Sequence, residues 1–111
     1  FFQYQVVNHL SETDERQWSQ RYYKSSEFFG GPGSPIFLIL GGEGAIDPST
    51  GLAYPFIAKH LAKEFSAYVL QPEHRFYGKS QPISPENQTG STLVTLMTSE
   101  QAMLDAVHLL R

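Results

Sequence analysis

The feature that most constrains the fold is an apolar run at residues 36–40 (Ile-Phe-Leu-Ile-Leu), followed directly by a glycine-rich segment at 41–44 (Gly-Gly-Glu-Gly). Five apolar residues without polar alternation are typical of a strand that is buried on both faces of a parallel sheet. Residues 55–65 change to the four-residue spacing of an amphipathic helix, and residues 67–70 form a second short apolar run. This order of strand, helix and strand predicts a βαβ unit with a right-handed crossover.

Further elements are expected on both sides of this unit. Residues 3–10 and 18–23 mix β-branched and aromatic residues with polar ones in rough alternation, which is typical of half-exposed strands. Residues 81–92 hold two prolines, a glycine and several small polar residues, and predict a long exposed loop. The expected fold class is therefore α/β, with antiparallel entry strands followed by a βαβ unit of a mostly parallel sheet.

The last part of the chain predicts a helix that begins with a capping box. Thr98 is the expected N-cap, and Gln101 is the third helical residue, whose side chain would return to the N-cap amide. One side of this helix is apolar, and we expect it to be the buried side; its residues are Ala102, Met103, Ala106, Val107 and Leu110. His60 and His108 are expected on solvated helix faces.

Composition excludes several function classes. A net charge of −3, with no cluster of Lys and Arg, argues against binding to a nucleic-acid backbone. The longest apolar run is far shorter than the roughly twenty residues that a membrane-spanning helix needs, so we expect no membrane span. The absence of cysteine excludes disulfides and thiolate chemistry within this sequence. The four histidines lack metal-ligand spacing, and we expect neither a metal nor another cofactor.

Two segments that follow the apolar runs could carry chemistry. The loop at 41–44 matches neither a dinucleotide-binding nor a P-loop pattern, which leaves an oxyanion-donating loop or a plain tight turn. The segment 73–80 (Glu-His-Arg-Phe-Tyr-Gly-Lys-Ser) is dense in ionisable and aromatic residues. We interpret it as a structural loop in which Glu73 or Arg75 anchors a neighbouring loop, because a catalytic His74 would need a nucleophile and an acid that the spacing does not supply.

No serine of the sequence lies in the Gly-x-Ser-x-Gly pattern that exposes a nucleophile. The glycines at 30–33 precede the apolar strand and are interpreted as a connecting turn. Asn87 opens an Asn-Gln-Thr sequon within the expected exposed loop, and it is a glycosylation candidate for a protein of the secretory route.

Five segments in this order carry a family resemblance: 7–10 (Val-Asn-His-Leu), 18–22 (Trp-Ser-Gln-Arg-Tyr), 35–44, 73–80 and 98–102 (Thr-Ser-Glu-Gln-Ala). Together they resemble the eukaryotic serine peptidase family of lysosomal Pro-X carboxypeptidase, dipeptidyl peptidase II and thymus-specific serine protease. The pairing of Gly-Gly-Glu-Gly with Glu-His-Arg-Phe-Tyr-Gly leans toward the thymus-specific branch. The resemblance covers nearly the whole chain.

This resemblance implies an α/β-hydrolase fold with a helical cap and a Ser-Asp-His triad that cleaves peptides near their ends. Residues 1–111 would be the N-terminal portion of the peptidase domain, with the triad beyond Arg111, so the isolated chain is expected to be inactive. A peptide substrate and a secretory, lysosomal, vesicular or extracellular location follow, and a homodimer of the full-length protein is left open. The alternatives are an α/β-hydrolase esterase or lipase, and a non-catalytic truncated binding domain.

The resemblance also implies roles for residues of the two loops. The amide of Gly42 or Glu43 would donate to the oxyanion, and Glu43 would either hold Arg75 or recognise a free amine of the substrate. Glu73 and Arg75 would support the active-site loop. For Arg75 we predict hydrogen bonds to Glu43 or to backbone carbonyls of residues 41–47.

Overall fold

The computed structural model describes residues 1–42, 44–46 and 56–111. Two small sheets organise the described residues. The first is an antiparallel pair of β1 (Phe2–Val6) and β2 (Gln17–Gln20). The second has the order β3-β5-β4, and its strands are β3 (Tyr22–Ser25), β4 (Ile36–Leu38) and β5 (Tyr68–Pro72). The mixed helix and strand content agrees with the expected α/β class.

The central strand β5 pairs in parallel with β4 and antiparallel with β3. The parallel pairing of the two apolar runs is therefore confirmed. Complete burial of the first run is wrong for this chain, because Ile36 is 53% and Leu40 is 50% exposed, whereas Val69 of β5 is fully buried. The difference arises because β4 has a neighbour on one edge only within the described part of the chain.

The single strand expected at 18–23 is divided between the two sheets. The break is at Arg21, whose amide donates to the Ser80 hydroxyl at 2.9 Å instead of to a neighbouring strand. The Arg21 guanidinium turns inward to Glu73. A buried polar side chain thus redirects the backbone from β2 into β3.

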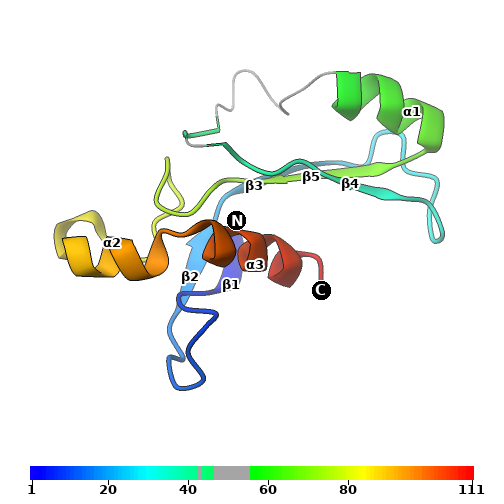
Figure 1. Cartoon of the computed structure of the whole chain (residues 1–111). Coiled ribbons are helices and arrows are strands. Elements are labelled where there is room, and N and C mark those ends of the chain that lie inside the picture. The colour runs from blue at the N-terminus through cyan, green and yellow to red at the C-terminus, as the bar shows by residue number, and fades with distance from the viewer. Residues whose placement is uncertain (43, 47–55) are drawn as a thin grey trace.

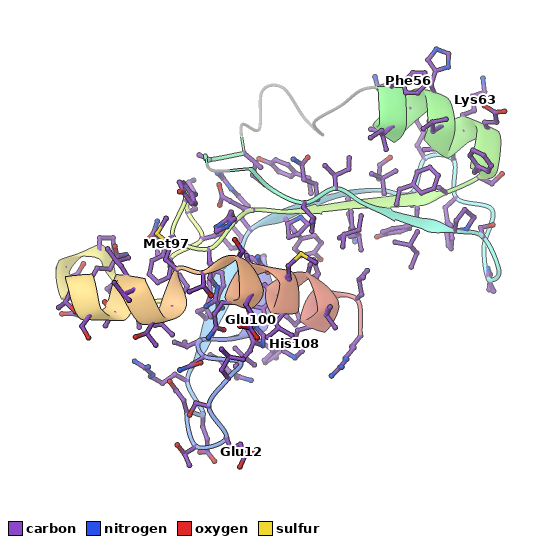
Figure 2. The ribbon with its side chains drawn as sticks, viewed as in Figure 1. Glu12, Phe56, Lys63, Met97, Glu100 and His108 are labelled. Carbon is purple, nitrogen blue, oxygen red and sulfur yellow. The ribbon has the colours of Figure 1, made fainter. Side chains whose placement is uncertain are left out.

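The expected helix before the second apolar run is present from residue 56, first as a π-helical segment η1 (Phe56–Leu61) and then as α1 (Ala62–Phe65). Its small residues Ala58 and Ala62 pack on Ile39 and Val69 of the sheet region. The helical spacing predicts Phe65 on the buried side, but this side chain is 55% exposed. Figures 1 and 2 show α1 over the three-stranded sheet, with Phe56 and Lys63 projecting away from it.

The segment expected as a long loop is partly helical. It contains a 3-10 turn, η2 (Pro85–Asn87), and the start of α2 (Gly90–Leu96). The composition of α2 is poor in strong helix formers, but Thr89 and Thr92 form a capping box that satisfies its first amides. This cap stabilises the first turn of α2.

The last helix, α3 (Ser99–Leu109), begins where it was expected, and the Thr98 hydroxyl accepts the Gln101 amide at 3.1 Å. The other half of the predicted capping box is wrong, because the Gln101 side chain bonds the His9 amide and Asn8 instead. The predicted buried face is confirmed only at Ala106, which is 3% exposed, and is wrong for its larger side chains. Met103, Val107 and Leu110 are 52%, 43% and 44% exposed, whereas Gln101 and Asp105 are buried.

The polar side of α3 faces the first sheet, and α3 contacts β1 (Figure 1). Figure 2 shows His108 on the side of α3 that faces β1 and β2, and Glu12 at the far tip of the connection between these strands. A second small apolar cluster, of Val7, Trp18 and Leu96, lies in this part of the molecule. Within the described ranges, none of the helices has the length and apolar character needed to cross a bilayer.

Candidate functional site

A cavity of about 200 Å³ opens where β4 and β5 end, beside the N-terminal half of α3. The carboxyl ends of parallel strands are the usual place for ligands in α/β folds. The lining residues come from both strand ends, from β2 and from α3; they are Gln20, Leu40, Gly41, Pro72, Glu73, His74, Arg75, Ser99, Ala102, Met103 and Asp105. Both segments that the sequence singled out therefore contribute to this cavity.

Glu73 joins the end of β5 to the segment that follows β4. Its carboxylate is fully buried and accepts bonds from Arg21 Nη2 at 2.6 Å and from the Ile46 amide at 2.9 Å. Arg21 Nη2 also donates to the Ile46 carbonyl at 2.8 Å. Both backbone polar groups of Ile46 are thus held by one buried ion pair.

The Glu73 carboxylate remains ionised in this setting. Burial raises its pKa, but the hydrogen bonds from Arg21, Ser80 and the Ile46 amide outweigh burial, and the net pKa is lowered. Further donors are the Ser80 hydroxyl at 2.8 Å and the Lys79 amide at 3.1 Å. This carboxylate is therefore a fixed anchor of the site rather than a group suited to proton transfer near neutral pH.

Two glycines allow the chain to pass close to this anchor. A Cβ at Gly41 would lie 2.6 Å from the Pro72 carbonyl oxygen and 2.9 Å from the His74 amide, both of which are backbone atoms. Gly78 has a positive φ of 54°, and a Cβ there would overlap the Glu73 carboxylate. Side chains at these positions would push the two loops apart.

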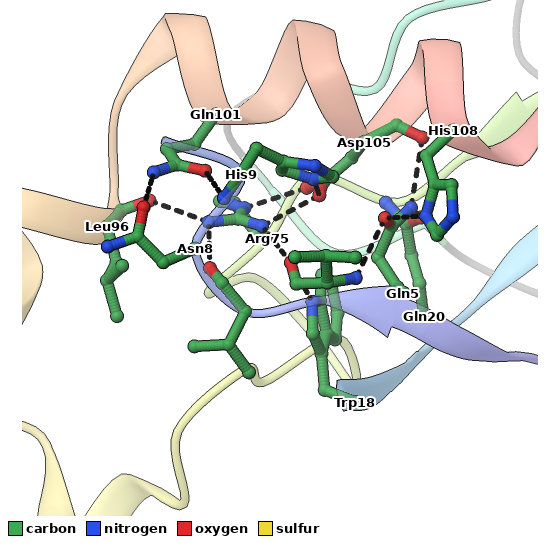
Figure 3. Close-up of polar contacts among 12 residues, drawn as sticks. Gln5, Asn8, His9, Trp18, Gln20, Arg75, Leu96, Gln101, Asp105 and His108 are labelled. Carbon is green, nitrogen blue, oxygen red and sulfur yellow. Dashed lines mark hydrogen bonds and ion pairs between the residues drawn. The ribbon is translucent and has the colours of Figure 1, made fainter. Parts of the chain in front are cut away.

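Arg75 lies on the other side of the cavity and uses all five of its N–H groups (Figure 3). Nε and Nη2 donate to the two oxygens of Asp105, each at 2.7 Å. The remaining three N–H groups donate to the carbonyls of Val6, Val7 and Leu96 at 3.0 to 3.1 Å. The guanidinium also lies 5.6 Å from the centre of the Trp18 ring, a cation–π distance.

These contacts correct the prediction for Arg75. All five of its N–H groups donate to other acceptors, so none reaches a carbonyl of residues 41, 42 or 44–46, whereas Glu43 and residue 47 lie outside the described residues. Arg75 joins β1, α2 and α3, and Glu73 is the residue that holds the loop after β4. Both residues were expected to support that loop, and within the described residues only the Glu73 side chain bonds to it.

A layer of buried amides and half-buried imidazoles surrounds the Arg75–Asp105 pair (Figure 3). His9 Nε2 donates to Asp105 Oδ1 at 2.7 Å. Gln5 Nε2 donates to the Asp105 carbonyl oxygen and to Gln20 Oε1, both at 2.9 Å. Gln5 Oε1 accepts a hydrogen bond from His108 Nδ1 at 2.9 Å. Among the described residues, no buried side-chain nitrogen or oxygen lacks a partner.

The prediction that His108 is solvated is wrong. Its ring is half-buried between α3 and β1, 6.0 Å from the ring of His9 and 5.4 Å from that of Phe2. Burial lowers the pKa of His108, electrostatic repulsion from His9 and Arg111 lowers it further, and Asp105 acts in the opposite direction. His108 therefore stays neutral to lower pH than a solvated histidine.

The remaining candidates of the sequence are found in different settings. Gly42 is exposed, and its amide has no acceptor within the described part of the chain, whereas Glu43 lies outside the described residues. His74 lines the cavity, with Nδ1 2.8 Å from the Arg75 carbonyl oxygen. Asn87 is exposed in η2, away from the cavity. The described residues contain no cluster of three metal-ligating side chains.

Comparison with known proteins agrees with this arrangement of motifs. The family model described as serine carboxypeptidase S28 matches residues 5–111. The chain is 41% identical over 101 residues to "Probable serine protease EDA2" of Arabidopsis thaliana, which covers 91% of this chain and 19% of that protein.

Two relatives from animals extend the comparison. Lysosomal Pro-X carboxypeptidase of Mus musculus is 32% identical over 110 residues, covering 96% of this chain and 21% of the relative. Thymus-specific serine protease of Homo sapiens is 38% identical over 78 residues, covering 70% of this chain and 15% of the relative. In the Arabidopsis thaliana and Mus musculus relatives, the match includes at least nine-tenths of this chain but only about a fifth of the relative's own length. By its sequence, this chain belongs to the S28 family of serine carboxypeptidases.

Proposed function

We propose that this chain is the N-terminal portion, residues 1–111, of a serine-type exopeptidase with an α/β-hydrolase fold. The enzyme would hydrolyse peptide bonds near chain ends, as a dipeptidyl peptidase or a Pro-X carboxypeptidase does, through a Ser-Asp-His triad outside these residues. The observation that carries the proposal is the family match across residues 5–111. The cavity at the ends of β4 and β5 supports it, because α/β enzymes bind substrates there.

In this proposal the described residues supply the oxyanion side of the active site. The exposed Gly42 amide is a candidate donor to the developing oxyanion, and Glu43, outside the described residues, remains a candidate on sequence grounds. Glu73 and Arg21 would hold the segment after β4 against the end of β5, because each of them forms a hydrogen bond with the backbone of Ile46. Such a loop stabilises charge only when a nucleophile attacks a carbonyl, so it provides no turnover alone.

The exposed apolar surface supports assignment to a larger domain. The radius of gyration is 15.0 Å, whereas a compact domain of this length has about 13 Å. Large apolar side chains are exposed along β4 and α3, namely Ile36, Leu40, Met103, Val107 and Leu110. We propose that further parts of the α/β domain cover them in the full-length protein.

The cellular setting is also part of the proposal. The Mus musculus relative is named lysosomal, and we extend that location to the secretory route in general, with a lysosomal, vesicular or extracellular destination. The partner is a peptide substrate. A homodimer of the full-length protein remains an expectation from the family resemblance.

The test uses the natural full-length gene product. We expect it to react covalently with a fluorophosphonate serine probe and to release product from dipeptidyl or Pro-X peptide substrates between mildly acid and neutral pH. Hydrolysis of short esters without hydrolysis of peptides would replace the proposal with an esterase or lipase. Absence of both probe labelling and hydrolysis would favour a non-catalytic binding protein.

A second experiment tests where the nucleophile lies. Residues 1–111, purified alone, should show no peptidase turnover at any pH in this range. Turnover that persists through repurification and is lost on substitution of a serine or histidine within residues 1–111 would contradict the location of the triad outside them.

A further inference from the structure

The segment 84–89 forms an exposed turn that has no role in the proposed peptidase function of the protein. Its sequence is Ser-Pro-Glu-Asn-Gln-Thr, and its centre is the 3-10 turn η2, which the Asn87 amide closes on the Ser84 carbonyl at 2.8 Å. Ser84, Pro85, Glu86 and Asn87 are all exposed. The turn thus offers four consecutive polar or small side chains to solvent.

Gln88 fixes the direction in which Asn87 points. The Gln88 side chain turns toward the protein, where Nε2 donates to Gln81 Oε1 at 2.7 Å and to the Ile83 carbonyl at 2.9 Å. Ile83 itself packs against the cluster of Val7, Trp18 and Leu96. Because Gln88 is held inward, the preceding Asn87 is presented outward on an ordered turn.

Thr89 has two roles that must be separated. Its hydroxyl accepts the Thr92 amide at 3.2 Å as the N-cap of α2, which is a sufficient structural reason for a threonine. It is also the third residue of the Asn-x-Ser/Thr acceptor sequence for N-glycosylation. The cap explains Thr89 but does not explain an exposed asparagine two residues earlier.

We propose that Asn87 is the attachment site of an N-linked oligosaccharide. The donor is a lipid-linked oligosaccharide diphosphate. Asn87 Nδ2 attacks the anomeric carbon, a C–N bond forms, and the bond from that carbon to the diphosphate oxygen breaks with its electron pair leaving on the diphosphate. The amide nitrogen gives one proton to a base of the transferase.

The glycan would not obstruct the candidate active site. The cavity is lined by residues up to Arg75 and from Ser99 onward, and none of its lining residues belongs to 76–98. Figure 1 shows α2, which directly follows the turn, at the end of the molecule opposite α1. The proposal therefore also marks this end as a surface that stays in water in the full-length protein, in contrast to the apolar sides of β4 and α3.

This inference rests on entry into the secretory route, which is part of the proposed function, and not on peptidase activity. The experiment therefore directs the protein into the secretory pathway. The full-length protein is expressed in eukaryotic cells behind a secretion leader, and its N-glycans are removed by a glycosidase in heavy-oxygen water, which converts a glycosylated asparagine to a labelled aspartate. Cleavage after Lys79 and Arg111 yields a peptide of residues 80–111 whose only asparagine is Asn87.

We expect this peptide to carry the heavy-oxygen label at position 87, and to be depleted before glycan removal. Recovery of the peptide with unmodified Asn87 at full abundance from secreted protein would overturn the proposal. An inactive enzyme that carries the label at this position would contradict the proposed function and leave this inference intact.

Matched variants separate the acceptor sequence from the helix cap. Asn87→Gln and Thr89→Asp should both abolish the label. In Thr89→Asp the aspartate at residue 89 still provides an N-cap oxygen for α2, so this variant removes the acceptor sequence and keeps the helix cap. Thr89→Ser keeps both functions and should retain the label. Equal labelling in Thr89→Ser and Thr89→Asp would contradict the assignment.

Discussion

The Arg75–Asp105 pair gives the sharpest quantitative prediction. In Arg75→Ala the buried Asp105 carboxylate loses two charge-assisted bonds of 2.7 Å, and the carbonyls of Val7 and Leu96 lose the Arg75 donor, whereas the Val6 carbonyl keeps Trp18 Nε1 as a donor. Removing one partner of a buried ion pair costs about 3–5 kcal/mol, because the other charge is left uncompensated. We expect the free energy of unfolding of the full-length protein to fall by this amount. Arg75→Lys can replace at most three of the five donors and should cost about 2 kcal/mol.

The measurement is urea unfolding followed by circular dichroism, with Arg16→Ala as the control. Arg16 pairs with Asp14 at 2.7 Å but its side chain is 59% exposed, so its loss should cost about 0–1 kcal/mol. The double variant Arg75→Met with Asp105→Leu should cost less than the sum of the single substitutions, since neither charge remains buried alone. A loss below about 1 kcal/mol in Arg75→Ala, or additivity in the double variant, would refute this reasoning.

Three further predictions concern the same region. Glu73→Gln should lower the free energy of unfolding by about 3 kcal/mol in the same titration, because the ion pair between Arg21 and the fully buried Glu73 carboxylate is lost; wild-type stability would contradict the anchor role. Gly78→Ala should cost about 2 kcal/mol or more, whereas Gly90→Ala, where a Cβ meets nothing within 4 Å, should be neutral; equal effects would exclude the steric argument. Since the pKa of His108 is lowered in the folded state, its contribution to stability is present above the ordinary histidine pKa of about 6.5 and is lost as pH falls below it. His108→Gln should therefore show a smaller loss of unfolding free energy between pH 7 and pH 5, and an unchanged slope would contradict this assignment.

The parts of the fold that the sequence predicts are those governed by local pattern. The apolar runs at 36–40 and 67–70 give parallel strands, and the alanine-rich spacing between them gives the helical segment that packs on the sheet. The N-cap at Thr98 is likewise local. By contrast, the division of 18–23 into two strands depends on the contact of Arg21 with Glu73, which is 52 residues away in the sequence. A contact over this separation cannot be predicted from a local sequence pattern.

The sequence predicts that the loops after the two apolar runs lie together, but not which side chains join them. Both loops that follow the apolar runs contribute to the cavity, because the ends of adjacent parallel strands lie at one edge of the sheet. The predicted acceptors of Arg75 lie in the neighbouring loop, whereas its observed acceptors lie on or beside β1, α2 and α3. A signal for the true partner was present: Gln101, Asp105 and His108 are spaced four and three residues apart, which places them on one face of a helix.

The polar face of α3 is buried because the energies favour it over the apolar face. Turning Met103, Val107 and Leu110 inward would bury roughly half of each side chain and gain about 3 kcal/mol in total, given about 2 kcal/mol for complete burial of one. The same rotation would separate Asp105 from Arg75, which costs about 3–5 kcal/mol. It would also break the bonds of Gln101 to His9 and Asn8, at about 1 kcal/mol each. A buried guanidinium at the end of β5 therefore fixes the orientation of a helix whose hydrophobic pattern predicts the opposite one.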